Sequence, residues 1–404
     1  MHTLARTASF ALAVAAAATL ALPQSPAAKH KSRPAQQERT ATRAEVVPAQ
    51  PQRIPFTASD QALAQIPGIA DARFWADSVP DFTRALPVPR GPWLTLSAGG
   101  ADGAYAAGFL NGWTASGARP EFSVVIGSSI GALVAPFAFL GPEYDPVLRE
   151  QFTRVTAADV FEAGATPDSL LDTWPLRELI GRHVTPKLLA DVAAAHQAGR
   201  RLFVLTANLD AERPVIWNMG AIAAHGDEAA LKLFRDVLLA SAAIPGVFPP
   251  VYIDAEANGQ HFREMHADGA LAGPFFVAPL AALSATSPFR LPASELYIVL
   301  NSKLTPDFGV TDRSPISVLG RSFSVALKGA ARVALANVYP VARRSDTAFK
   351  LTYIDAAFAQ PSRGAFDPDY MQALFDFGAA KGRDGAAFHE QPPAPAAERA
   401  VVGQ

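Results

Sequence analysis

A serine between two glycines is the residue of this chain best suited to covalent chemistry. Residues 124–126 (Val-Val-Ile) favour a β-strand that runs into residues 127–131 (Gly-Ser-Ser-Ile-Gly), and a helix-compatible segment follows. This order predicts a sharp strand–turn–helix with Ser129 at the turn, where Gly127 and Gly131 avoid the collisions that a Cβ would cause. A helix N-terminus favours developing negative charge, so Ser129 is a candidate nucleophile. The alternative is an ordinary glycine-bounded turn, because G-x-S-x-G patterns also arise by chance.

A second glycine-rich turn lies one helix upstream of the serine. A short apolar strand leads into residues 97–104 (Ser-Ala-Gly-Gly-Ala-Asp-Gly-Ala), and a helix is predicted to follow. The two turns should therefore lie at the carboxyl ends of neighbouring parallel strands. There, the backbone N–H groups of Gly99, Gly100 and Ala101 would point at one spot near the serine, as in an oxyanion hole. Dinucleotide binding is a weaker interpretation, because the spacing is not G-x-G-x-x-G.

A serine nucleophile needs a base, and several candidates follow it in the chain. Asp268 precedes Gly269 at a predicted strand-to-turn junction, just after a segment of small residues and prolines. His266 lies two residues earlier and would share a strand face with Asp268. His389 would complete a Ser…Asp…His order of the α/β-hydrolase type. An Asp-Gly pair usually marks only a turn, so the residue pattern leaves the base open among these candidates.

Composition limits the classes of function that remain. The chain has 404 residues, no cysteine and a formal net charge of −2. The lack of cysteine excludes disulfides, thiolate metal sites and a cysteine nucleophile. The near-neutral charge gives no electrostatic argument for binding nucleic acid. Neither observation bears on the oligomeric state, which stays open.

The ends of the chain differ in composition from its middle. An apolar run at residues 10–22 is too short to span a bilayer comfortably and has the length of a signal peptide. The predicted parts are, in order, a signal peptide (1–28), a disordered linker (29–54), an N-terminal extension packed on the catalytic domain (55–90), the catalytic domain (91–380) and a disordered Ala/Pro-rich tail (381–404). The extension is predicted to hold one short helix and an irregular segment. The signal peptide predicts export to the periplasm, the outer membrane or the medium; an uncleaved anchor or a misassigned start is the alternative.

Three blocks, taken together, resemble the patatin-like phospholipase family. They are residues 97–103 (Ser-Ala-Gly-Gly-Ala-Asp-Gly), the serine turn at 127–131 and residues 268–270 (Asp-Gly-Ala), and they occur in the family's order. Residues 240–250, which end in Phe-Pro-Pro, also resemble the stretch ahead of the family's aspartate. The resemblance covers roughly residues 93–378. It implies a three-layer α/β/α fold with a central, mostly parallel sheet and helices on both faces.

The resemblance also implies a catalytic dyad without histidine. Ser129 would be the nucleophile and Asp268 the general base, with an acyl-enzyme intermediate. A carboxylate with an ordinary pKa near 4 is a weak base, so we expect Asp268 to be partly desolvated with a raised pKa. No metal or cofactor is implied. The oxyanion donors and the motif positions that support the turns would be the following residues: Gly99, Gly100 and Ala101 as donors; Gly103, Gly127, Gly131, Gly269 and Ala270 as support.

Two positions depart from the family pattern and bear on the substrate. The family often has glycine where Ala98 stands, and Arg or Lys where Asp102 stands. Ala98 leaves the backbone donors in place, whereas Asp102 removes a cation that would attract anionic head groups. We expect an enzyme that hydrolyses carboxylic esters, a serine lipid acyl hydrolase of the phospholipase A or lysophospholipase type. A general carboxylesterase for soluble short-chain esters and a non-catalytic exported binding protein are the alternatives.

An acyl chain requires an apolar groove. Residues 137–140 (Phe-Ala-Phe-Leu) and 275–277 (Phe-Phe-Val) are candidates to line it, with plain core packing as the alternative. A lipid substrate also raises the question of peripheral membrane contact. Four basic side chains would be available to face anionic lipid, although a solvated face is the favoured interpretation: Lys328, Arg332, Arg343 and Arg344.

Overall fold

The computed structural model describes residues 53–86, 90–385 and 387–393. The predicted signal peptide (1–28) and all but the last two residues of the predicted linker (29–54) lie outside these ranges. Within the described ranges, no helix is both long enough and apolar enough to cross a bilayer.

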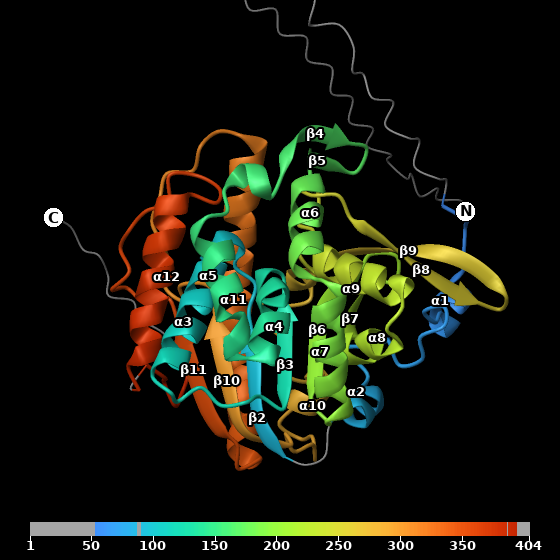
Figure 1. Cartoon of the computed structure of the whole chain (residues 1–404), viewed down its shortest axis with the longest axis horizontal. Helices are drawn as coiled ribbons and strands as arrows, with labels where there is room; N and C mark the ends of the chain where they lie inside the picture. Colours follow the sequence, from blue (N-terminus) through green and yellow to red (C-terminus); the bar gives the residue numbers. More distant parts are fainter. Residues whose placement is uncertain (1–52, 87–89, 386, 394–404) are drawn as a thin grey trace, which may run out of the picture. The chain divides into compact units, whose positions relative to one another are not determined.

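A nine-stranded sheet organises the described part of the chain (Figure 1). Its strands are β1 (Arg73–Trp75), β2 (Gly91–Leu96), β3 (Val124–Ser128), β6 (Arg201–Asn208), β7 (Arg213–Asn218), β8 (Val251–Ala257), β9 (Gln260–Asp268), β10 (Ala293–Leu300) and β11 (Ala348–Tyr353). Seven follow the order β1-β7-β6-β3-β2-β10-β11, while β9 pairs with the carboxyl end of β6 and β8 pairs with β9. The run from β6 to β11 is parallel, and β1, β7, β8 and β9 join through antiparallel pairs.

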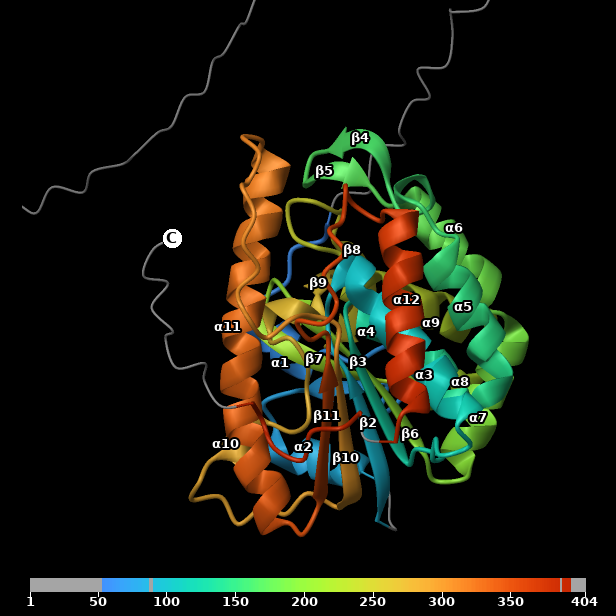
Figure 2. The same ribbon diagram turned by 90° about the vertical axis from the view of Figure 1, so that its left-hand side faces the viewer.

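Helices cover both faces of this sheet, which Figure 2 shows nearly edge-on. One face packs against α3 (Gly103–Ala115), α4 (Ile130–Leu140), α5 (Asp145–Thr153), α6 (Trp174–His183), α7 (Pro186–Gln197), α8 (Met219–His225), α9 (Glu228–Ser241) and α12 (Pro368–Arg383). The other face packs against α2 (Val79–Ala85), α10 (Leu280–Leu283) and α11 (Pro315–Arg344). Outside these layers, α1 (Ala58–Leu63) lies against β8, and β4 (Glu162–Thr166) pairs with β5 (Ser169–Asp172). The predicted α/β/α fold with a mostly parallel sheet is confirmed.

The central strands are buried on both faces, as their apolar sequences dictate. Val124 and Ile126 pack into the core beneath α2, α10 and α11, whereas Val125 packs beneath the helices of the opposite face. Side chains alternate along a strand, so a continuous apolar run serves both layers. The parallel pairing of β2 with β3 sets Leu96 opposite Gly127. The two glycine-rich turns therefore leave the sheet at the same edge, as predicted.

The N-terminal extension is more regular than the sequence predicts. In place of one helix and an irregular segment, residues 55–90 contain α1, α2 and the strand β1. β1 extends the sheet through antiparallel pairing of Arg73 with Trp217 on β7. A three-residue strand is too short to show an alternating pattern, and the exposed edge of β7 decides its conformation.

The described part of the tail does not match the prediction of disorder for residues 381–404. α12 continues to Arg383, and Ala387 and Phe388 are half-buried against the core. The Phe388 ring lies 5.0 Å from that of Trp113 and 5.2 Å from that of Tyr297, and His389 forms a bridge with Leu351 of β11. One aromatic side chain that enters an aromatic cluster holds this segment, which its Ala/Pro-rich composition does not reveal.

Candidate active site

Ser129 lies on the sharp turn between β3 and α4. Its φ of 55° and ψ of −127° are unusual for a residue with a side chain. Such a conformation costs about 1–3 kcal/mol and persists only where the surroundings enforce it. The flanking glycines permit the close packing of this turn: a Cβ on Gly131 would lie 2.3 Å from the Leu96 carbonyl oxygen, and one on Gly127 would lie 2.5 Å from the Gly131 carbonyl oxygen. The expected collisions are thus present.

Asp268 accepts a hydrogen bond from this serine. The Ser129 hydroxyl donates to Asp268 Oδ2 at 2.7 Å, and the Ala270 N–H donates to Oδ1 at 2.8 Å. Asp268 is the last residue of β9 and pairs with Thr206 on β6, the neighbour of β3. The structure therefore brings together two residues that the sequence singled out separately. Their catalytic roles stay predictions.

The Asp268 carboxyl is enclosed by protein. Its side chain has no exposed surface, and burial raises its pKa to about 7. The hydrogen bonds from the Ala270 N–H and the Ser129 hydroxyl offset only part of this rise, because they stabilise the charged form less than water would. The direction and the cause are those expected from the sequence.

The predicted oxyanion donors border the same cavity as the serine. Gly99 ends the loop after β2, and Gly100 and Ala101 begin a short 3₁₀ helix (Gly100–Asp102) that leads into α3. N–H groups in the first turn of a helix have no partner within that helix, so they are available to a ligand. This geometry permits the predicted binding of an oxyanion, which stays a prediction.

Asn301, which sequence reasoning did not identify, anchors this loop. Its Nδ2 donates to the Ser97 carbonyl at 2.8 Å, its own N–H donates to Ser97 Oγ at 2.8 Å, and its Oδ1 accepts from the Ala106 N–H at 3.1 Å. The side chain is fully buried at the end of β10. The available signal was a polar residue directly after a buried apolar strand, which rarely occurs without a partner.

Ser241 is a second residue that sequence reasoning missed. Its Oγ accepts the Ser129 N–H at 3.0 Å and donates to the Leu205 carbonyl at 2.7 Å, so it ties the serine turn to β6. The small side chains of the segment around it allow its backbone to approach the site closely. The additional signal was a single hydroxyl within that segment.

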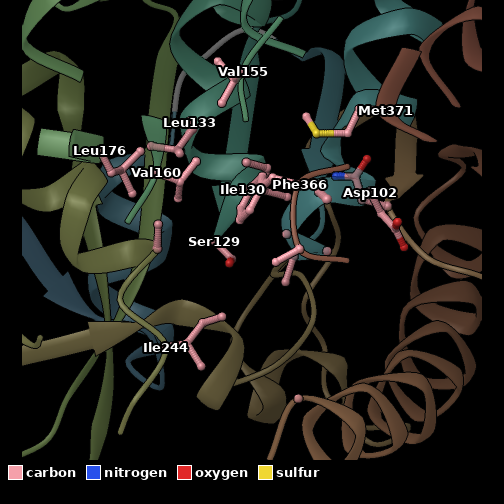
Figure 3. A pocket seen from close by; sticks show the side chains of 18 of the residues that line it. Asp102, Ser129, Ile130, Leu133, Val155, Val160, Leu176, Ile244, Phe366 and Met371 are labelled. Atoms are coloured by element: carbon pink, nitrogen blue, oxygen red, sulfur yellow. The ribbon is translucent and has the colours of Figure 1, made fainter. Parts of the chain in front are cut away.

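An apolar cavity of about 540 Å³ opens above Ser129 (Figure 3). Its apolar lining comes from α4, α5, α6, α11 and α12, from the loops at 155–161 and 244–248 and from the segment around Phe366. It includes Leu133, Phe137, Val155, Val160, Phe161, Leu176, Ile244, Phe248, Leu319, Phe323, Phe366 and Met371. Of the predicted groove segments, Phe137 lines the cavity. Phe139, Phe275 and Phe276 instead lie in or against the core, because they face the sheet layers.

The cavity carries charged groups on the side of α11. Asp102, Lys303, Asp307, Arg321 and Lys328 line it there. Burial raises the pKa of Asp102 to about 6; a hydrogen bond of 2.6 Å from the Tyr370 hydroxyl and the charges of Lys328 and Lys303 limit the rise. The position where the family often has a cation thus holds a carboxylate, but two lysines from other elements lie near it.

The histidine candidates for the base contact other groups. The two ring nitrogens of His266 lie 3.0 Å from Thr206 Oγ1 and 3.1 Å from Glu264 Oε2, and the ring is fully buried. His389 stacks on Tyr353 at the edge of the sheet. Among the described residues that line the cavity, the one histidine is His183, whose Nε2 lies 2.6 Å from the Gln151 amide nitrogen. The partner of the Ser129 hydroxyl is therefore a carboxylate.

Of the four basic side chains for which a solvated face is the favoured interpretation and lipid contact the alternative, Arg343 is exposed, and the other three have identified neighbours within the fold. Arg332 donates to the Leu304 carbonyl, and Arg344 donates to the Ala282 carbonyl at 2.9 Å. Lys328 lines the cavity. Within the part of the chain that the structure describes, no cluster of three or more His, Asp or Glu side chains is arranged to hold a metal ion.

Comparisons with known proteins add an independent finding. The family model described as patatin-like phospholipase matches residues 94–281. A search of curated proteins finds no match. Among solved structures, the crystal structure of VipD from Legionella pneumophila is similar at 10% sequence identity and a TM-score of 0.38, over 74% of this chain and 67% of that chain.

Proposed function

We propose that the protein is a serine hydrolase that releases fatty acids from lipid esters, on the premise that residues 94–281 match the family model described as patatin-like phospholipase. The observation that carries the proposal is the 2.7 Å hydrogen bond from Ser129 to the buried Asp268, on a strained turn beneath an apolar cavity. A strained backbone and a buried carboxylate both lower the stability of the fold. Such groups occur mainly at functional sites, which supports a catalytic role for this pair.

The proposed reaction proceeds in two steps. As Ser129 Oγ attacks the ester carbonyl carbon, its proton passes to Asp268 Oδ2, and the carbonyl oxygen takes up the negative charge near the N–H groups of residues 99–101. The alcohol leaves with the proton from Asp268, and an acyl-enzyme remains. Water then loses a proton to Asp268 and attacks the acyl carbon. The fatty acid departs as the proton returns to Ser129.

The raised pKa of Asp268 supports its role as the base. Proton transfer is most effective when the pKa of the base lies near the working pH. A carboxyl with a pKa of about 7 is largely ionised at pH 8 and still basic enough to accept a proton. An exposed aspartate would be ionised but some thousandfold less basic, since each pKa unit is a factor of ten.

The cavity favours a phospholipid as substrate. Its apolar lining suits an acyl chain, and Lys303, Arg321 and Lys328 supply positive charge on one side for an anionic head group. These cations would take the place of the one that the family often has at Asp102. The carboxylate of Asp102 in the same cavity is the observation that keeps a neutral, soluble ester as the second candidate.

The test compares two substrates with matched variants. Fatty-acid release is measured from phospholipid vesicles and from a soluble short-chain ester, with Ser129→Ala, Asp268→Asn and the control Ser128→Ala. The control removes the neighbouring hydroxyl, which is buried and has no hydrogen-bond partner among the described residues. Release from vesicles that Ser129→Ala and Asp268→Asn abolish and Ser128→Ala retains would support the proposal.

Other results would change the assignment. Hydrolysis of the soluble ester alone, lost in the same two variants, would favour a carboxylesterase. Activity that survives Ser129→Ala would contradict the nucleophile. Loss of activity in His389→Ala, with Asp268→Asn still active, would favour the α/β-hydrolase triad. No hydrolysis of either substrate by the correctly folded protein would favour a binding role.

A further inference from the structure

The N-terminal half of α11 and the loop before it expose large apolar side chains beside the cavity. We propose that residues 308–325, here called the docking segment, insert into the surface of an anionic lipid bilayer and hold the cavity mouth against it. This inference rests on the proposed function, because it states how a lipid substrate would reach Ser129.

The first observation is exposure. In the loop, Phe308 is 96% and Val310 89% exposed; on the helix, Val318 is 53% and Val325 66% exposed. No residue from 315 to 330 is buried, whereas the C-terminal half of α11 packs on the sheet through residues such as Leu335 and Val338. Figure 2 shows the N-terminal half extending past the carboxyl ends of the strands.

The second observation is clustering. Single exposed apolar residues are normal, but a contiguous group marks a surface that meets another apolar phase. Of the thirteen large apolar side chains that the described residues expose, seven lie between residues 308 and 333. They are Phe308, Val310, Ile316, Val318, Leu319, Val325 and Val333.

The third observation is charge, which selects a lipid surface as the occupant. Residues 303–332 hold five basic and two acidic side chains, a net charge of +3 in a chain whose net charge is −2. They are Lys303, Arg313, Arg321, Lys328 and Arg332, with Asp307 and Asp312. Within the docking segment itself the net charge is +1, from Arg313 and Arg321 against Asp312. The cavity lining beside it adds Lys303 and Lys328. Basic residues flanking exposed apolar ones are typical of segments that lie in the interface of anionic membranes.

The fourth observation is continuity with the cavity. Ile316, Leu319 and Phe323 recur at helical spacing and line the cavity that contains Ser129, whereas Val318 and Val325 do not. One side of α11 therefore faces the cavity and another faces outward. An acyl chain that leaves the bilayer along α11 would reach the serine without crossing water.

The side of the cavity mouth opposite α11 also exposes apolar side chains. Leu170 on β5 is 48% exposed and Trp174 at the start of α6 is 56% exposed, and their neighbours Leu171 and Leu176 line the cavity. Figures 1 and 2 both show β5 at the end of the molecule toward which the N-terminal half of α11 extends. A flat bilayer would thus contact apolar side chains on both sides of the opening.

The experiment measures binding separately from catalysis. The full chain carrying Ser129→Ala is sedimented with vesicles of phosphatidylcholine and phosphatidylglycerol, and with phosphatidylcholine alone. The test variant adds Phe308→Asp and Val310→Asp. The matched control adds Leu63→Asp and Leu280→Asp, which place the same charges at sites that are 56% and 71% exposed on α1 and α10. None of these four residues lines the cavity.

We expect the Phe308/Val310 variant to bind anionic vesicles at least tenfold more weakly, and the Leu63/Leu280 control to bind like its parent. Binding should also weaken when salt rises or phosphatidylglycerol is omitted. The proposal would be overturned if the parent did not bind vesicles. It would also be overturned if the Phe308/Val310 variant and the Leu63/Leu280 control bound vesicles equally well, or lost binding equally. A parent that dimerises through this segment, with the dimer lost in the Phe308/Val310 variant, would also overturn it by assigning the surface to a second copy.

The same substitutions with Ser129 intact separate this inference from the proposed function. Hydrolysis of a soluble short-chain ester should stay unchanged in the Phe308/Val310 variant, while hydrolysis of vesicle lipid should fall with binding. If the protein hydrolyses neither substrate, the proposed function fails, yet the vesicle-binding comparison still decides whether the segment docks.

Discussion

The hydroxyl of Ser129 and the carboxylate of Asp268 are joined by a hydrogen bond of 2.7 Å although 139 positions separate them in the chain. The contact exists because β3 and β9 both pair with β6, one parallel and the other antiparallel. The ends of β3 and β9 therefore meet beside a single strand. The Ala270 N–H holds the Asp268 carboxylate, and the Ser241 hydroxyl holds the Ser129 backbone N–H.

The two residues should act as one unit in catalysis. We expect Ser129→Ala and Asp268→Asn each to lower kcat/KM by about 10³-fold or more, and the double variant to lose no more than the worse single variant. A double-mutant cycle on the preferred ester measures this. Losses that multiply would show that the two residues act independently, and the dyad would then be rejected.

The pH dependence of activity should follow Asp268. Because the base must be ionised and its pKa is raised to about 7, kcat/KM should rise with pH through about 7 and level off above it. The profile is measured on a soluble neutral ester, so that head-group ionisation does not contribute. A profile that stays flat down to pH 4 would contradict a desolvated Asp268.

The raised pKa of Asp268 should lower the stability of the folded protein as the pH rises. Asp268 has an ordinary pKa near 3.8 when unfolded and about 7 in the fold, so the folded protein retains a proton that the unfolded chain releases between these values. The free energy of unfolding should therefore fall as pH rises from about 4 to 7, by about 1.4 kcal/mol for each pH unit at most. Asp268→Asn should remove this decline and be more stable than the parent at pH 8. Urea denaturation of both proteins at pH 4.5 and 8 measures this difference. If the free energy of unfolding changes equally with pH in both proteins, the prediction is wrong.

Ser241 should position the nucleophile. Ser241→Ala leaves the buried Ser129 N–H and the Leu205 carbonyl without their partner, which typically costs about 1–3 kcal/mol. We expect a lower Tm and a lower kcat with little change in KM. Ser128→Ala is the matched control, since that hydroxyl has no hydrogen-bond partner among the described residues. If both variants lose kcat equally, the contact with Ser241 has no specific role.

Asp102 should discriminate against anionic substrates. At pH 8 its carboxylate opposes the attraction of Lys303 and Lys328, so Asp102→Asn should lower KM for anionic phospholipid by about three- to tenfold, the factor for roughly 1 kcal/mol of repulsion. KM for a neutral ester should not change. Tyr370→Phe, which removes the hydrogen bond but keeps the charge, is the control. An equal change in KM for both kinds of substrate would point to altered shape rather than charge.

The candidate site was largely predictable where its chemistry is local. The strand–turn–helix around Ser129 follows from β-forming residues that run into a glycine-bounded turn. The roles of Asn301 and Ser241 could not be predicted from the sequence, because each residue contacts backbone groups that are distant in the chain. The strand β1 and the packing of Phe388 were not predicted for the same reason, since an edge strand and an aromatic cluster elsewhere in the chain hold them.

The amino-acid sequence by itself determined the local elements: apolar strands, glycine-rich turns at the ends of β2 and β3, and the helices that follow them. Short-range sterics and side-chain alternation are sufficient for these, because they involve neighbours in the chain. Only the tertiary structure decided the pairing of Ser129 with Asp268, the pKa of that carboxyl and the proximity of Lys303 and Lys328 to Asp102. Distance and desolvation depend on which remote segments surround a group, and folding alone brings those segments together.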